Sequence, residues 1–355
     1  MQKRVIQRTV LRGIHMRTDA PMNVNLRSTG SLEREILPML SKRIAEAIQK
    51  AGLSGLEPLE EVRLRAGKPL ILQNYFKEWF VKNDGTLSDK PADSFIVKQE
   101  DILSSLELIS ENSIYAYLDE IKNGYITMKG GHRVGLSGRV VSEGGTVRNI
   151  KDIAGLNIRI SNQIFGCSER VIGFIIKSGN DDHNTLIISP PKCGKTTILR
   201  DIARVLSDGA PKHCFKGVKV GVVDERSELA ACLRGIPQNN VGIRTDVLDG
   251  CPKSIGMPML VRSMSPKVII TDEIGNEGDR EAVHGVLNAG VRIIASAHGY
   301  NISELKSRRE VLKMMDEKVF ERYIVLGNAR GPGTLVEVID GLSMKPLTGA
   351  GTYAV

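Results

Sequence analysis

The sequence predicts an α/β protein in which a domain with a doubly wound, mainly parallel sheet follows a smaller α+β domain. From about residue 166, four apolar segments of strand length alternate with helical stretches; they are TLIIS (185–189), VKVGVVDE (218–225), KVIITDE (267–273) and VRIIASAH (291–298). Each segment is short, β-branched and apolar on both faces, which is typical of strands buried in a parallel sheet. Their alternation with helices favours a doubly wound domain.

The first half of the chain has a different pattern. Residues 31–50 and 99–122 carry apolar side chains at helical spacing, whereas LEEVRLR (59–65) alternates apolar residues with arginines. Residues 124–141 and 155–164 indicate short strands joined by glycine turns. We therefore expect an α+β domain over residues 31–165 and the parallel-sheet domain over 166–345, with tails at 1–30 and 346–355.

Composition bounds the class of protein. The 355 residues are 41% hydrophobic and 25% charged, which is ordinary for a globular protein, and no apolar run is long enough to span a bilayer. The net charge of +8 permits contact with nucleic acid or an anionic membrane but requires neither, and 4% aromatic residues argue against a base-stacking sheet. Five cysteines without C-x-x-C spacing support neither disulfides nor a zinc site, which favours the reducing cytoplasm.

The first thirty residues are basic. They contain Lys3, Arg4, Arg8, Arg12, Arg17 and Arg27 against the single acid Asp19. Such an opening is also typical of organelle transit peptides, but no amphipathic apolar face accompanies it here. We expect a disordered basic tail, or an extension that precedes a true start at Met16 or Met22.

Polar residues follow the four buried strands. Strands of a doubly wound sheet end at one edge, and ligands bind in the crevice beyond that edge. The residues expected there are Ser189, Asp224, Glu225, Asp272, Glu273 and His298. This edge is therefore the candidate functional site.

The segment LIISPPKCGKTTILRDIAR (186–204) joins the first of these strands to a helical pattern. As a phosphate-binding loop it would use Ser189, Pro190, Pro191, Lys192, Cys193, Gly194, Lys195, Thr196 and Thr197. Lys195 would reach the outer phosphates of a nucleotide, and the Thr196 hydroxyl would hold Mg²⁺. The prolines precede the amide cradle, but a glycine would take a left-handed backbone angle more easily than Lys192. An ordinary strand–turn–helix is the alternative.

KVIITDE has the form of a Walker B strand. Asp272 would hold Mg²⁺, and Glu273 would orient or deprotonate the attacking water. An acidic helix cap is the alternative, but the strand and the loop together favour an ATPase site that uses ATP and Mg²⁺. The order of the two strands in the sheet does not follow from the sequence.

Two further segments lie at the same predicted edge. In VVDERSEL, Asp224, Glu225 and Glu228 would polarise water or tune Mg²⁺, unless they only cap a helix. Glu225 is thus a second candidate base, although we prefer Glu273 because it directly follows the Mg²⁺ aspartate. His298 would sense the γ-phosphate, the alternative being a hydrogen-bonded core histidine.

These four segments occur in the order seen in type II and type IV secretion ATPases, whose RecA-like P-loop domains they resemble. VDERSEL is similar to that family's aspartate box, and ASAHG is similar to its histidine box. Arg262 corresponds to the arginine in the stretch that leads into the family's Walker B strand. Gly275 stands where the family usually has an arginine, two residues beyond the Walker B glutamate. EVRLRAGKPL, GGHRVGLSGR, NIRI, VDERSELAAC, GIPQNNVGIRTDVLDGCPK and RSMSPKVIITDEIG resemble the stage III sporulation protein AA family, over residues 31–345. Lys192 departs from that family's glycine. No nucleic-acid module follows the ATPase domain, unlike in the related chloroplast and cyanobacterial ATPases.

The resemblance implies a secretion-type ATPase, acting as a hexameric ring in the mother-cell cytoplasm of an endospore former. It would dock onto membrane-embedded channel proteins that link mother cell and forespore, and power their assembly or transport through them. Candidate arginine fingers are Arg63, Arg65, Arg139, Arg159, Arg244 and Arg262. The alternatives are a nucleic-acid motor, for which the sequence offers no strong evidence, and an ATP-binding scaffold with little turnover.

Overall fold

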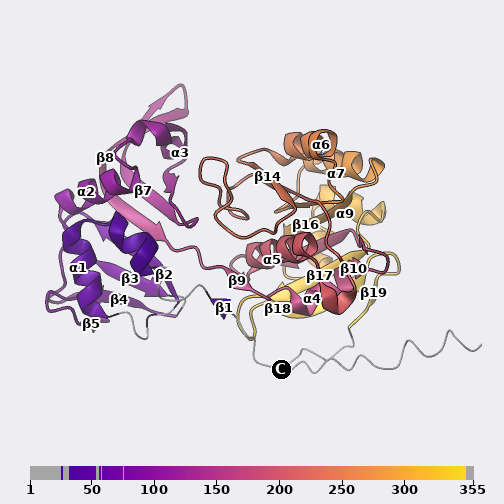
Figure 1. The fold of residues 1–355 in the computed structure, drawn as a ribbon, viewed down its shortest axis with the longest axis horizontal. Helices are drawn as coiled ribbons and strands as arrows, with labels where there is room; N and C mark the ends of the chain where they lie inside the picture. Colours follow the sequence, from indigo (N-terminus) through magenta and orange to yellow (C-terminus); the bar gives the residue numbers. More distant parts are fainter. Residues whose placement is uncertain (1–24, 27–31, 53–55, 57, 75, 349–355) are drawn as a thin grey trace, which may run out of the picture.

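The computed structural model describes residues 25–26, 32–52, 56, 58–74 and 76–348, which form two lobes, each built on one sheet (Figure 1). The first sheet lies within residues 59–159 and the second within 185–346. We propose that the domain boundary lies near residue 165, between the two sheets. Most of the basic stretch 1–30, with Met16 and Met22, and most of the tail 346–355 lie outside the described residues.

The N-terminal lobe is an antiparallel sheet covered on one face by helices. Its strands, in the order β5-β4-β3-β2-β8-β7-β6, are β2 (Leu59–Arg65), β3 (Ile71–Asn74), β4 (Glu78–Val81), β5 (Leu87–Ser88), β6 (Tyr125–Thr127), β7 (Arg133–Glu143) and β8 (Thr146–Arg159). The helical elements are η1 (Leu32–Ile36), η2 (Leu37–Met39), α1 (Lys42–Ala51), α2 (Gln99–Ile109), η3 (Ile114–Tyr117) and α3 (Leu118–Lys122). Val62 and Leu64 of β2 are buried in the core beneath the helices, so the arginines that alternate with them lie on the opposite, open face.

The strands β7 and β8 are longer than expected. Short strands joined by glycine turns were predicted for this region, but the chain forms one hairpin with strands of 11 and 14 residues. Gly138 does not end β7, because it lies in a bulge where a Cβ would come within 2.6 Å of the Lys151 carbonyl oxygen. Gly138 does mark a local irregularity of the strand, but the prediction that a strand ends there was wrong.

The C-terminal lobe has the predicted RecA-like organisation. Its eight-stranded sheet has the order β14-β13-β15-β16-β12-β17-β18-β19 and is parallel from β14 to β17. The strands are β12 (Thr185–Ser189), β13 (Val220–Asp224), β14 (Thr245–Asp249), β15 (Val268–Thr271), β16 (Arg292–His298), β17 (Arg322–Gly327), β18 (Thr334–Asp340) and β19 (Lys345–Pro346). The four strands predicted from the sequence are β12, β13, β15 and β16, and β16 lies between β12 and β15.

Helices cover both faces of this sheet and bury its central strands, whereas the edge strands β14 and β19 are partly exposed. On one face are α4 (Glu169–Ile175) and α5 (Lys195–Asp208), and on the other α6 (Lys253–Met264), α7 (Glu277–Asn288), α8 (Ile302–Leu305) and α9 (Arg309–Asp316). The two apolar layers explain why the central strands lack alternation. Small elements complete the lobe: β9 (Ile164–Phe165), which pairs with β1 (Asn25–Leu26), and β10 (Ile176–Lys177), β11 (Asp181–Asp182) and η4 (Pro211–His213).

Two further findings concern the cysteines and the helices. All five cysteines are free thiols. Within the part of the chain that the structure describes, no helix combines the length and the apolar character needed to cross a bilayer.

A buried carboxylate links the helices α1 and α2 of the N-terminal lobe. Asp101, in the first turn of α2, is only 4% exposed and accepts hydrogen bonds from the Ser41 hydroxyl, the Arg43 guanidinium and the Lys98 N–H. Burial acts to raise its pKa, but these donors outweigh burial, and the pKa of Asp101 lies below the ordinary 3.8. The charged form therefore stabilises the fold.

We expect Asp101→Asn to lower the free energy of unfolding at pH 7 by about 2 kcal/mol, because the hydrogen bonds to a charge are weakened. The loss is full above the unfolded-state pKa of about 3.9 and disappears as the pH falls through the lower pKa of the folded state. Urea denaturation at pH 7, and at pH values below 3.8, measures the loss and its disappearance. Asp119→Asn is the control, since Asp119 is exposed and pairs only with Lys122. An equal loss in both variants would contradict the assignment.

Candidate nucleotide-binding site

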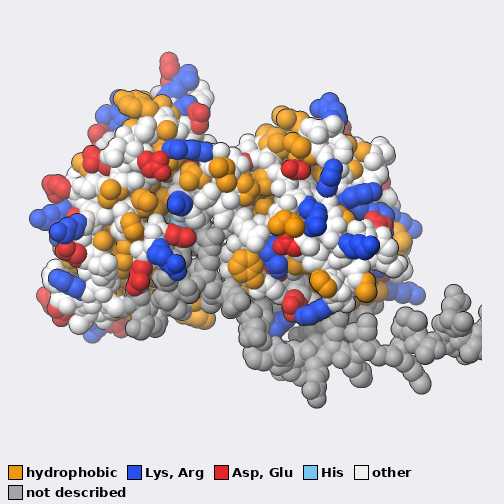
Figure 2. All heavy atoms as spheres, in the orientation of Figure 1, with side chains coloured by type: hydrophobic (Ala, Val, Ile, Leu, Met, Phe, Trp, Pro, Cys, Tyr) orange, Lys and Arg blue, Asp and Glu red, His pale blue; other side chains and the backbone are white. Residues whose placement is uncertain are grey.

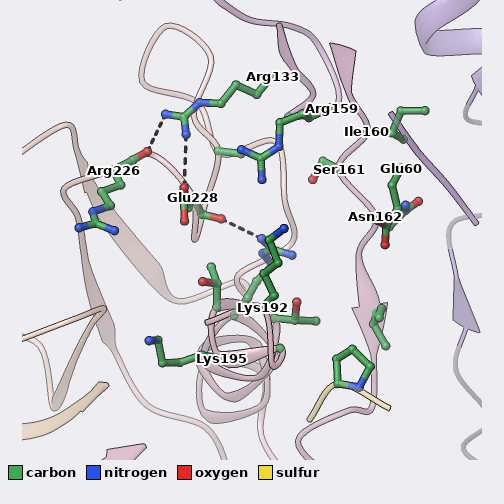
Figure 3. A pocket seen from close by; sticks show the side chains of 18 of the residues that line it. Glu60, Arg133, Arg159, Ile160, Ser161, Asn162, Lys192, Lys195, Arg226 and Glu228 are labelled. Atoms are coloured by element: carbon green, nitrogen blue, oxygen red, sulfur yellow. Dashed lines mark hydrogen bonds and ion pairs between the residues drawn. The ribbon is translucent and has the colours of Figure 1, made fainter. Parts of the chain in front are cut away.

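A cavity of about 980 Å³ lies between the carboxyl edge of the C-terminal sheet and the open face of the N-terminal sheet. Figure 3 shows Lys192 and Lys195 at the start of α5, with Arg133 and Arg159 of the N-terminal lobe across the cavity. Glu60, Ser161 and Asn162 form part of the wall on the N-terminal side. The cavity is therefore shared by the two lobes.

The predicted phosphate loop connects β12 to α5. β12 ends at Ser189 and α5 begins at Lys195, with Gly194 as its N-cap in a left-handed conformation (φ 78°). Seven of the nine predicted loop residues line the cavity: Pro190, Pro191, Lys192, Gly194, Lys195, Thr196 and Thr197. Ser189 and Cys193 are buried beside it. The helix N-terminus thus opens into the cavity, as anion binding requires.

Lys192 has an unusual backbone. Its φ is +61°, in the left-handed region that favours glycine, and its side chain is exposed to the cavity. The expectation that a glycine would suit this position better therefore has a geometric basis. The loop keeps a phosphate-loop shape at the cost of local strain.

Lys195, His298 and Glu273 form a continuous chain of contacts. The Lys195 ammonium donates to His298 Nδ1 at 2.8 Å, and His298 Nε2 lies 2.9 Å from Glu273 Oε1. Because an ammonium only donates, Nδ1 must accept, so the ring is neutral and its Nε2–H donates to Glu273. Burial and the neighbouring Lys195 lower the pKa of His298, which agrees with a neutral ring. Burial also lowers the pKa of Lys195, to about 8.

Glu273 is held on both of its oxygens. Its second oxygen, Oε2, forms an ion pair with Arg226 Nη1 at 2.6 Å, and its backbone has φ +35°, a strained value for a residue with a Cβ. Its N–H donates to the Ser296 hydroxyl of β16 at 3.0 Å. The carboxylate that follows the predicted Walker B strand is therefore fixed at the cavity wall.

Asp272 is poised to accept a cation. It is 4% exposed, and its Oδ1 accepts no hydrogen bond from the described residues; Lys253 Nζ lies 3.8 Å away. Burial raises the pKa of Asp272 to about 6, in opposition to Lys253. A buried carboxylate oxygen that accepts no hydrogen bond from the described residues, in a cavity that Thr196 also lines, fits a Mg²⁺ site.

Glu225 and Asp224 have different surroundings from Glu273. Glu225 forms an ion pair with the buried Lys253 and lies beside the cavity without lining it. Asp224 is fully buried and accepts the backbone N–H groups of Glu228 and Ala230, at 2.9 and 2.8 Å. Its carboxylate is therefore committed to shaping the loop that follows β13.

That loop also binds the N-terminal lobe. Arg133 of β7 donates to the Arg226 carbonyl oxygen at 3.0 Å and to Glu228 Oε1 at 3.3 Å (Figure 3). Its guanidinium lies 3.7 Å from the centre of the Tyr125 ring. From α5, Arg200 donates to the carbonyl oxygens of Leu229 and Glu228. The loop with Arg226 is thus pinned by both lobes.

The six candidate arginine fingers are dispersed. Within this chain, only Arg159 of the six lines the cavity. Arg63 pairs with Glu61, Arg139 pairs with Asp152, and Arg244 donates to the Ser207 carbonyl oxygen. Arg65 lies elsewhere on the open face of the first sheet, and Arg262 is exposed near the end of α6.

Sequence reasoning named Arg159 but missed three other arginines that line the cavity. These are Arg133, Arg200 and Arg226. The signals were present but generic: Arg226 directly follows the acidic pair of the DER segment, and Arg133 lies in a glycine-rich strand. No pattern in the sequence indicated that Lys253 forms an ion pair with Glu225.

Comparison with known proteins gives two results. Residues 31–344 match the model of the family described as sporulation stage III, protein AA. Stage III sporulation protein AA of Bacillus subtilis (strain 168) is 44% identical over 306 residues, which cover 86% of this chain and 94% of that protein.

Among solved structures, the ATPase DotB of Legionella pneumophila is similar, with a TM-score of 0.53 at 14% identity, over 80% of this chain and 75% of that chain. The pilus retraction motor PilT with bound ADP is similar, with a TM-score of 0.50 at 12% identity, over 82% and 77%. At such identities the likeness establishes the RecA-like fold alone.

We expect Lys192→Gly to raise the free energy of unfolding by about 1 kcal/mol, because glycine relieves the strain of the left-handed backbone. Lys192→Ala removes the same side chain but keeps a Cβ, so it should give no comparable gain. Chemical denaturation of the three proteins without nucleotide makes the comparison. Equal stability of the Gly and Ala variants would show that the backbone is not strained there.

Proposed function

The chain belongs to the sporulation stage III, protein AA family, and we propose that it is a Mg²⁺-dependent ATPase of the secretion type. It would energise the assembly of, or transport through, a channel complex between mother cell and forespore. The observation that carries the proposal is the meeting of Lys195, Asp272, Glu273 and His298 at one cavity, beside a left-handed Gly194 at the start of α5. The fold shared with DotB and PilT supports it.

Nucleotide phosphates would occupy the N-terminus of α5. The backbone N–H groups that follow Pro191 would donate to phosphate oxygens, and the helix dipole favours their charge. Lys195 would exchange its contact with His298 Nδ1 for the outer phosphates. A phosphate beside the ammonium raises the pKa of Lys195 from about 8, so binding favours its charged form.

Thr196 and Asp272 would hold the Mg²⁺. The bound ion would neutralise charge on the transferring phosphoryl group. Asp272 would then lose its proton to solvent more readily, because an adjacent cation lowers a carboxyl pKa. Lys253 keeps a positive charge near Asp272 in the absence of the ion.

Glu273 is the preferred general base. It lines the cavity, whereas Glu225 is held beside it by Lys253. The attacking water would give its proton to Glu273 while its oxygen bonds to the γ-phosphorus, and the bond to the β–γ bridging oxygen would break to release ADP. His298 would hold the carboxylate through Nε2 and would register the γ-phosphate through the loss of Lys195 from Nδ1.

The oligomeric state and the location are part of the same proposal. We propose a hexameric ring in the mother-cell cytoplasm, associated with membrane-embedded sporulation proteins. An open interdomain cavity with Arg133, Arg159 and Arg226 on its walls supplies charge from both lobes, and a neighbouring subunit would complete the enclosure that excludes water.

We expect Lys195→Ala to weaken Mg-ATP binding at least about tenfold, because charged hydrogen bonds to the phosphates are lost. Glu273→Gln should bind Mg-ATP but hydrolyse it at about one hundredth of the wild-type rate or slower, because the attacking water keeps its proton. Phosphate release and spore counts measure both variants.

Lys212→Ala is the matched control, since Lys212 is an exposed lysine of the same lobe that pairs only with Glu169. If the wild-type protein neither binds nor hydrolyses ATP and Lys195→Ala sporulates normally, the protein is a scaffold. DNA-stimulated hydrolysis would instead indicate a nucleic-acid motor.

A further inference from the structure

A second, smaller cavity lies on the open face of the N-terminal sheet. Its volume is about 230 Å³, and we call it the arginine trough; Arg63, Arg65, Ser137 and Asn157 are its polar lining, with Gly135 and Gly155 in its floor. The strand register sets these residues in two rows, Arg63–Asn157–Gly135 and Arg65–Gly155–Ser137, across β2, β8 and β7. Neither the ATPase proposal nor the family comparison uses this site.

Two polar atoms of the trough have no hydrogen-bond partner among the described residues. Arg65 Nε and Asn157 Oδ1 are buried, and neither has a hydrogen-bond partner among the described residues. Arg65 forms no ion pair with those residues either, whereas Arg63 pairs with Glu61 at 3.2 Å. A donor and an acceptor removed from water without partners cost stability, and such groups are otherwise rare in folded proteins. Their shared position indicates a ligand that supplies both missing partners.

The floor allows another main chain to approach closely. A Cβ added at Gly135 would meet only Asn157 atoms, the nearest at 3.7 Å, so the space above this glycine is open. At Gly155 the Ser137 hydroxyl occupies the place of the missing Cβ, at 2.5 Å from it. Glycine in a strand interior weakens the sheet and often marks such an approach.

The chemistry of the trough favours a peptide. A peptide unit offers a carbonyl oxygen to Arg65 and an N–H to Asn157, and carboxylates complement an arginine that has no counter-ion. A nucleic acid fits less well, because no aromatic side chain lines the trough for stacking and Glu61 borders it. On the face drawn in Figure 2, acidic and basic side chains are interspersed, so that face presents no broad basic field.

We propose that the arginine trough binds an extended, acidic peptide segment of a partner protein. Asn157 lines both the trough and the interdomain cavity, so the bound segment would lie next to the nucleotide site. The site is independent of ATP hydrolysis. A Lys195→Ala protein should therefore bind the segment as the wild type does.

The test is fluorescence anisotropy with a labelled ten-residue peptide of alternating Asp and Gly, and with a Lys–Gly peptide of the same length. We expect only the acidic peptide to bind, and Arg65→Gln to weaken its binding about tenfold, because a charged hydrogen bond is lost. Arg139→Gln should change the affinity by less than about twofold, since Arg139 is an exposed arginine of the same sheet, is paired with Asp152, and lies outside the trough.

Gly135→Val tests the floor without changing charge. Valine suits a strand, so the variant should fold, yet its side chain fills the trough and should abolish binding. Unchanged affinity in Gly135→Val, or equal losses in Arg65→Gln and Arg139→Gln, would overturn the site. Failure of the acidic peptide to bind at millimolar concentration would overturn the ligand class, as would tighter, Arg65-dependent binding of a dT10 oligonucleotide.

Discussion

Parallel pairing of β12 with β16 places Ser189 opposite His298, and this register determines the rest of the candidate site. β15 pairs with the other side of β16, so the strand that precedes Asp272 and Glu273 ends at the same edge. β13 pairs with β15 in turn and brings Asp224 to that edge. A slip by one residue would move these edge residues out of register and would disrupt the close packing of side chains in the apolar layers on both faces. The chemistry of the site is thus fixed by the hydrophobic burial of four short strands.

The loop after β13 connects this edge of the sheet to the N-terminal lobe. Asp224 holds its N–H groups, Arg200 of α5 holds its carbonyl oxygens, and Arg133 holds it from the N-terminal sheet. The side chain of Arg226 projects from this pinned loop onto Glu273. Any displacement of the N-terminal lobe must therefore either break the Arg133 contacts or move Arg226. The geometry couples the position of the lobe to the environment of the Glu273 carboxylate.

The sequence predicted the elements of the C-terminal sheet and the residues at its edge, because buried parallel strands have a strong local signature. It did not predict the contact between Lys195 and His298, since that contact depends on β16 lying between β12 and β15, and strand order is a long-range property. Arg133 and Arg226 were missed for the same reason: each acts on residues far away in the chain. The length of the β7–β8 hairpin was wrong because glycines at a bulge and glycines at a turn look alike in sequence. The sequence also could not show that Arg65 Nε and Asn157 Oδ1 are buried without hydrogen-bond partners among the described residues, because such a property depends on the three-dimensional structure.

The charged groups of the site pair with one another. Lys195 is bound by His298, both oxygens of Glu273 are engaged, and Lys253 lies between Glu225 and Asp272. This self-pairing avoids the cost of leaving buried charges uncompensated. A nucleotide must exchange these contacts for its own, so its net affinity is the difference between two sets of charged interactions rather than the sum of the new ones. The exchange begins at Lys195, and His298 joins Lys195 to Glu273. In the proposed mechanism, one neutral imidazole therefore links phosphate binding at Lys195 to the freedom of the Glu273 carboxylate.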